Sequence, residues 1–155
     1  MLVESISALV GATQDALERM LGRSSVRGPI GTVQGDGFTT HQINVVCSFS
    51  GRLSGQVIFG MSLGTADRIA SSLTGEQIVT FDATASEMIM ALCKEILGRL
   101  THAMSESGVC LELATPRMIR GTRVNMRCKG GTCIVIPFTV DEGELCATIS
   151  LDEAA

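Results

Sequence analysis

The sequence predicts an α+β domain in which a long central helix packs on an antiparallel β-sheet. Helical periodicity is strongest over residues 85–107, where apolar side chains recur every three or four positions until Gly108. Two β-prone runs, residues 43–49 and 53–61, are separated by a short turn. The C-terminal third alternates strand-like runs with glycine-containing turns, a pattern that is typical of an antiparallel meander.

The N-terminal part is predicted to begin with an amphipathic helix and to continue as loop. Apolar residues have helical spacing over residues 4–21, and Gly22 follows as a helix stop. Residues 24–40 are rich in Gly, Ser and Thr, so we expect irregular chain or short edge strands there. The turn at residues 50–52 then joins the two strands of a hairpin.

A short helix is predicted after the hairpin, at residues 63–73. Ser62 or Thr65 is its candidate N-cap, because a side-chain oxygen there can accept a hydrogen bond from the first turn. Gly75 follows its expected end, as is common after helices.

The long helix is expected to follow an extended stretch at residues 78–81. Thr84 and Glu87 stand three positions apart at its start, which is the spacing of a capping box. Beyond the helix, residues 112–120 contain Pro116 and lead to the meander. The meander is expected to comprise strands at residues 123–128, 132–140 and 144–151, with turns at 129–131 and 141–143.

The two halves of the chain resemble each other weakly. Each contains a helix with a Gly-Arg pair, Gly22-Arg23 in the first half and Gly98-Arg99 in the second, and each continues to a hairpin. We interpret this as an internal duplication of a helix-plus-antiparallel-strands unit within a single domain, residues 1–155. The predicted halves are about 1–77 and 78–155.

The composition argues against several classes of protein. Of the 155 residues, 45% are hydrophobic and only 18% are charged, which excludes a disordered chain, and no apolar run is long enough to span a membrane. The net charge of −4, the scattered basic residues and the lack of Trp and Tyr argue against a nucleic-acid partner. The first residues show no signal-peptide pattern, so we expect a cytoplasmic protein.

The six cysteines are expected to be structural thiols. None forms a Cys-x-x-Cys pair, and only two histidines, His41 and His102, could add ligands, so no metal site is predicted. Several cysteines stand where a strand or helix pattern requires an apolar residue. No Ser or Cys lies in a recognisable signature with a His, so catalysis by a nucleophile of the chain's own is the weakest hypothesis.

One face of the long helix is predicted to lie outside the core. At 100° per residue the apolar positions share one side, and Ala91 and Gly98 leave a strip on the other side that another backbone could approach closely. Glu87, Lys94 and Glu95 supply polar groups around this strip. A solvated surface explains the same pattern, with Glu87 as a capping residue and Gly98 as a helix glycine that costs about 1 kcal/mol.

The order of the elements and several short strings resemble the CheX-like proteins of the CheC/CheX/FliY group of chemotaxis phosphatases. Each string is weak alone, but their order and spacing cover nearly the whole chain. They are Met20-Leu21-Gly22, Leu53-Ser54-Gly55-Gln56-Val57-Ile58-Phe59, Ala66 with Ile69-Ala70, Gly98, Pro116, Val135-Ile136-Pro137-Phe138, Gly143-Glu144-Leu145 and Ile149-Ser150-Leu151.

The resemblance implies a mechanism and a partner. Active members of the family carry Glu-x-x-Asn on a long helix, preceded by Asp or Ser and followed later by Pro. The acidic residue engages a CheY-like response regulator, and the amide orients the water that attacks the regulator's aspartyl phosphate. The resemblance also implies that the receiver domain carries the magnesium ion, that this chain needs no cofactor, and that it forms a homodimer through the sheet by pairing of its terminal strands.

This chain departs from the family's motif. With Gly98 matched to the glycine that follows the motif, the Glu and Asn positions fall on Ala91 and Lys94. Pro116 then lies one residue from the usual spacing. A Lys ammonium can hold an anion, but it has no acceptor and cannot orient a water as an amide does.

Other registers do not restore the motif. Starting at Glu87 puts Met90 at the amide position, and starting at Glu95 puts Gly98 there. The face can therefore bind a partner even where its chemistry is altered. The candidate catalytic residues are Glu87, Lys94 and Glu95, and the candidate partner-binding residues are Glu87, Ala91, Lys94, Gly98 and Pro116.

Two functional hypotheses follow. The leading one is a chemotaxis protein that binds a phosphorylated CheY-like response regulator, with hydrolysis of the aspartyl phosphate left open by the degenerate motif. The alternative is a catalytically inactive module for binding or dimerisation in two-component or motility signalling.

Overall fold

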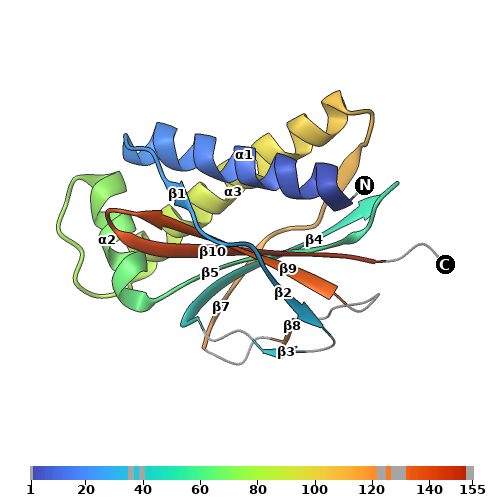
Figure 1. Ribbon diagram of the computed structural model, residues 1–155. Helices are drawn as coiled ribbons and strands as arrows, with labels where there is room; N and C mark the ends of the chain where they lie inside the picture. The colour runs from blue at the N-terminus through green and yellow to red at the C-terminus, as the bar shows by residue number, and fades with distance from the viewer. Residues whose placement is uncertain (1, 35–36, 39–40, 122–124, 127–131, 153–155) are drawn as a thin grey trace.

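Three helices and an antiparallel sheet form two layers in the computed structural model, which describes residues 2–34, 37–38, 41–121, 125–126 and 132–152. In Figure 1, α1 and α3 lie on one face of the sheet, whereas β3 and β8 lie on its other side. The helices are α1 (Leu2–Leu21), α2 (Leu63–Thr74) and α3 (Ala83–Glu106). This architecture confirms the predicted fold class.

The described strands form an eight-stranded sheet and a separate two-stranded ribbon. The sheet has the order β1-β9-β10-β5-β4-β6, with β2 also paired to β9 and β7 also paired to β4, and all these pairings are antiparallel. The ribbon pairs β3 with β8. The strands are β1 (Val26–Arg27), β2 (Gly31–Gln34), β3 (Gly37–Phe38), β4 (Ile43–Gly51), β5 (Gly55–Met61), β6 (Leu111–Leu113), β7 (Arg117–Arg120), β8 (Asn125–Met126), β9 (Thr132–Val140) and β10 (Gly143–Leu151).

The sheet separates a large core from a small apolar cluster. Successive side chains of a strand point to opposite faces. In β4, Val45 and Cys47 therefore belong to the main core beneath the helices, whereas Val46 lies on the other face with Ile58 and Cys133.

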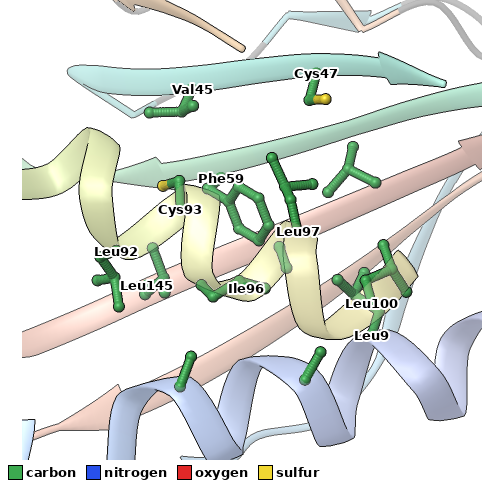
Figure 2. Close-up of a cluster of buried hydrophobic side chains, with 14 of the residues drawn as sticks. Leu9, Val45, Cys47, Phe59, Leu92, Cys93, Ile96, Leu97, Leu100 and Leu145 are labelled. Atoms are coloured by element: carbon green, nitrogen blue, oxygen red, sulfur yellow. The ribbon is translucent and has the colours of Figure 1, made fainter. Parts of the chain in front are cut away.

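The apolar side of α3 is buried between the sheet and α1. Figure 2 shows Phe59 of β5 and Leu9 of α1 close to the side chains of this helix. Both residues are fully buried. The α3 residues that are at most 1% exposed are Ala85, Ile89, Leu92, Cys93, Ile96, Leu97, Leu100 and Met104.

Most of the predicted elements are confirmed. The long helix, the hairpin, the short helix and the last two strands form as expected, and the glycine-rich stretch contains short strands. Residues 78–81 are irregular and form no strand. The predicted strand at 123–128 lies mostly, and the turn at 129–131 entirely, outside the described residues. The internal duplication stays a prediction.

The predicted capping box of α3 is wrong. The helix begins two residues earlier than predicted, and its N-cap is Asp82, whose Oδ1 accepts a hydrogen bond from the backbone N–H of Ala85 at 2.9 Å. Thr84 and Glu87 are therefore already inside the helix. In α2 the prediction holds, because the hydroxyl of Ser62 accepts from the N–H of Thr65.

The expectation of structural thiols holds for the buried free cysteines Cys47, Cys93 and Cys146. Cys110 is a free thiol as well, but it is exposed. The expectation is wrong for Cys133, which is disulfide-bonded.

Pairing of the terminal strands between subunits is also contradicted. β10 lies between β9 and β5, so both of its edges are used within the chain. β1 and β2 occupy the other edge of β9. A local sequence pattern does not reveal that two short early strands fold back onto β9.

Replacing Asp82 by Ala should lower the free energy of unfolding by about 1 kcal/mol, because the first turn of α3 loses its side-chain acceptor. Urea unfolding followed by circular dichroism measures the change. Thr84→Ala is the matched control and should change stability by less than about 0.5 kcal/mol. If Thr84→Ala lost more stability than Asp82→Ala, the capping box predicted from the sequence would be correct instead.

Candidate functional site

The exposed side of α3 forms a continuous strip. Because the buried residues fix the rotation of the helix about its axis, the opposite positions must face outward. The strip spans twelve residues, or about 16 Å along the helix at 1.5 Å per residue. We call it the outer strip, and it consists of the exposed residues Glu87, Ala91, Lys94 and Gly98.

Lys94 is an unpaired cation at the middle of the outer strip. Its neighbours one turn away along the helix are Met90, Ala91, Leu97 and Gly98, none of which is acidic. Among the described residues, the side chain makes no ion pair. The ammonium is therefore available to an anion from outside the chain.

The outer strip offers little steric obstruction around Lys94. A Cβ built on Gly98 would meet no atom within 4 Å, so this position faces open space. Ala91 is exposed and carries only a methyl group. Another backbone can therefore approach the helix closely on both sides of the lysine.

Glu87 is an exposed carboxylate at the N-terminal end of the outer strip. Because Asp82 caps the helix, Glu87 has no capping role that would explain it. It precedes Lys94 by seven residues, or about 10 Å of helix, so the two charges do not neutralise each other.

Glu95 lies outside the outer strip and is already engaged. One of its carboxylate oxygens accepts a hydrogen bond from Nε of Arg99 at 2.9 Å, an ion pair one turn along the helix. The nearby His102 and Glu106 form a second such pair at 3.1 Å when the imidazole is protonated. The sequence places Glu95 and Lys94 together as candidate catalytic residues. In the described part of the chain, Glu95 has an intramolecular partner and Lys94 has none.

A groove of about 440 Å³ between α1 and α3 borders the outer strip. Glu95 and Gly98 line it from α3, and Ser7, Gly11 and Asp15 line it from α1. A Cβ on Gly11 would also meet nothing within 4 Å. The α1 wall is not among the site residues predicted from the sequence, although its residues recur at helical spacing.

Pro116 stands at the edge of the sheet beside α3. It precedes β7, whose Met118 lies 3.2 Å (Sδ) from the hydroxyl of Ser86 in the first turn of α3. Pro116 is half-buried. The structure therefore places its segment along the N-terminal half of the helix, on the flank next to the outer strip.

The buried thiols are poor nucleophiles. Burial raises the pKa of Cys146 to about 12, helped by the hydrogen bond from its Sγ to the carboxylate of Glu144 at 3.4 Å. Burial likewise raises the pKa values of Cys47 and Cys93 above the usual range. Because the thiolate is the reactive form, none of these three is set up for covalent catalysis.

The described residues hold neither a metal-binding cluster nor a helix suited to a membrane. They contain no group of three or more His, Cys, Asp or Glu side chains placed to hold a metal ion. Nor does any helix within these ranges combine the length and apolar character that crossing a membrane requires.

The outer strip can therefore bind an anionic group. Its one carboxylate is Glu87, and around Lys94 itself it offers no acceptor for a water. Its one cation is a hydrogen-bond donor without an acceptor, and Ala91 contributes no polar atom. The arrangement suits recognition of a partner surface by a helix face.

Solved structures with the same fold come from chemotaxis proteins. The chain is similar to a CheC-like superfamily protein from Shewanella sp. PV-4, with a TM-score of 0.84 and 18% identity, over 99% of this chain and 100% of that chain. It is similar to CheX from Desulfovibrio desulfuricans, with a TM-score of 0.83 and 21% identity, over 96% and 99% of the two chains. No curated protein matches the chain.

A third similar structure is a complex of CheX with CheY, BeF3 and Mg2+ from Borrelia burgdorferi. Its TM-score is 0.78 at 22% identity, and the match covers 96% of this chain and 97% of that chain. At such identities the likeness of the three structures establishes the fold.

The sequence itself identifies the family. The model of the family described as chemotaxis phosphatase CheX matches residues 43–139, which is more than half of the chain. The match includes the whole of α3 and therefore the outer strip. The chain belongs to the CheX family.

Proposed function

We propose that the protein binds the phosphorylated receiver domain of a CheY-like response regulator through the outer strip of α3. The observation that carries the proposal is the unpaired Lys94, exposed between Ala91 and Gly98 on a helix held rigidly by the core. The family and the similar CheX–CheY complex support this class of partner. The proposal includes a cytoplasmic location.

The proposal separates binding from catalysis. Hydrolysis of an aspartyl phosphate requires a water whose oxygen attacks phosphorus in line with the bond to the aspartate oxygen, and a group that orients this water. The register that matches Gly98 to the family's glycine puts Ala91 and Lys94 at the two functional positions, and neither supplies an acceptor. We therefore propose that the native protein binds the receiver without accelerating hydrolysis, and that magnesium is carried by the receiver.

Restoring the family's side chains should create phosphatase activity. The double variant Ala91→Glu, Lys94→Asn supplies a carboxylate and a water-orienting amide at exposed positions, and we expect at least a tenfold faster loss of receiver phosphate than with the native protein. The decay of a phosphorylated CheY-like receiver at saturating protein measures this rate.

The matched control for this double variant is His102→Glu, Ser105→Asn. It has the same residue types and spacing, at exposed positions further along α3. It should leave the rate at the native level. An unchanged rate with the Ala91→Glu, Lys94→Asn protein would reject the assigned register.

Filling the open space at Gly98 should block the receiver. Gly98→Gln places a flexible side chain on the outer strip, and we expect at least a tenfold loss of affinity by isothermal titration calorimetry. The variant should remain folded and gain about 0.5–1 kcal/mol, because glycine is unfavourable within a helix.

Gly11→Gln is the control for Gly98→Gln, since it also extends into open space, but from α1. Its affinity for the receiver should stay within about twofold of the native value. Unchanged binding by Gly98→Gln would move the contact surface away from the outer strip.

We also propose a homodimer that forms at the edge of the sheet built by β1 and β2. Val26 in β1 and Ile30 just before β2 are 68% and 42% exposed, and large apolar side chains at a sheet edge favour association with a second copy. β1 and β2 already pair with the free edge of β9. The proposed interface would therefore be formed by side-chain contacts and not by backbone pairing of the terminal strands.

Light scattering after size-exclusion chromatography should give twice the chain mass of 16.3 kDa. Val26→Glu should shift the protein to the monomer, because a charge is costly to bury in an interface. Val79→Glu, at an equally exposed position between α2 and α3, should leave the dimer intact. A native protein of monomer mass at all accessible concentrations would contradict the dimer.

A further inference from the structure

We infer that Lys94 recognises the phosphoryl group of the bound receiver and holds it without promoting hydrolysis, so that this protein preserves the phosphorylated state of its partner. The inference rests on the proposed function, because it requires a receiver on the outer strip. It adds to that proposal the contact by which the protein distinguishes the phosphorylated receiver from the unphosphorylated one.

The charge balance along α3 leaves Lys94 without an acidic partner. The other basic groups of this helix that approach the strip have acidic partners, since Arg99 pairs with Glu95 and His102 lies 3.1 Å from Glu106. Lys94 has no acidic residue one turn away in either direction. A charge that the fold leaves uncompensated at the centre of a contact face favours an anionic group on the partner.

The side chain of Lys94 extends further from the helix than its neighbours on the outer strip. The ammonium ends a four-carbon stem, while the residues on either side of it along the strip, Ala91 and Gly98, have at most a methyl group. A phosphoryl group in a recess of the partner is therefore met first by Lys94, before the backbone of α3 makes contact.

The phosphorylated and unphosphorylated states of the receiver differ in the charge that Lys94 would face. A phosphoryl group adds roughly two negative charges near pH 7, whereas the carboxylates of the receiver are present in both states. An ammonium that faces this group gains charge-assisted hydrogen bonds only after phosphorylation. Lys94 should therefore make affinity depend on phosphorylation by about tenfold or more.

The chemistry of the ammonium group explains why the phosphate is retained. Three N–H donors can occupy phosphoryl oxygens, but an ammonium has no lone pair with which to accept a proton from water. The position of Lys94 therefore supplies no base, and Glu87, the carboxylate on the strip, lies about 10 Å earlier along the helix, two turns from this position. The bound phosphoryl group is therefore held without an activated nucleophile.

The experiment measures affinity for CheY-like receiver domains of the same organism in two states, untreated and activated with beryllofluoride and Mg2+. The native protein should bind the activated form at least tenfold more tightly. Lys94→Met keeps the length of the side chain and should remove this preference, leaving affinity for the untreated form within about twofold. Lys94→Arg should retain the preference, because the guanidinium keeps the charge and the donors.

Arg52→Met is the matched control, since Arg52 is an exposed cation in the turn between β4 and β5 and makes no ion pair among the described residues. It should behave as the native protein. In a second arm, the half-life of the receiver phosphate is measured with and without saturating native protein, and it should be unchanged or longer.

The possible results are distinguishable. A Lys94→Met protein that keeps the preference, while Gly98→Gln loses binding, would overturn the inference and leave the proposed function in place. A shorter half-life with the native protein would also overturn it. If the native protein binds neither form of any receiver, the proposed function fails, and the inference fails with it.

Discussion

The site depends on the burial of the apolar side of α3 between the sheet and α1. Eight side chains of this helix are at most 1% exposed, and full burial of a large aliphatic side chain contributes about 1.5–3 kcal/mol. Turning the helix about its axis would expose them. The core thereby fixes which residues face outward, and the orientation of Lys94 follows from packing that is remote from any ligand.

α1 lies beside α3 and shapes the exposed surface next to the outer strip. It creates a groove along one flank of the outer strip, where Glu95 and Arg99 neutralise each other. Lys94 projects from the middle of the outer strip and has no such partner among the described residues. In a chain with only 12 Lys and Arg residues, an uncompensated cation on an otherwise side-chain-poor helix face is a feature of the fold that a binding partner can use.

The outer strip was predictable from the sequence because a helix carries its two faces at a fixed period, so the buried positions of α3 define the exposed ones. Features that depend on other segments were not predictable in this way. Thr84 and Asp82 are both good cap residues, and only the backbone shows that Asp82 caps the helix. The α1 wall of the groove and the strands that cover β9 arise from tertiary contacts.

The central claim is that the outer strip of α3 is the surface that meets the receiver. Chemical-shift mapping on the 15N-labelled protein tests it directly, with addition of an unlabelled CheY-like receiver activated by beryllofluoride and Mg2+. The account predicts the largest shifts at the amides of Glu87, Ala91, Lys94 and Gly98. Shifts concentrated on the opposite side of the sheet, around Val46 and Ile58, with α3 unperturbed, would contradict it.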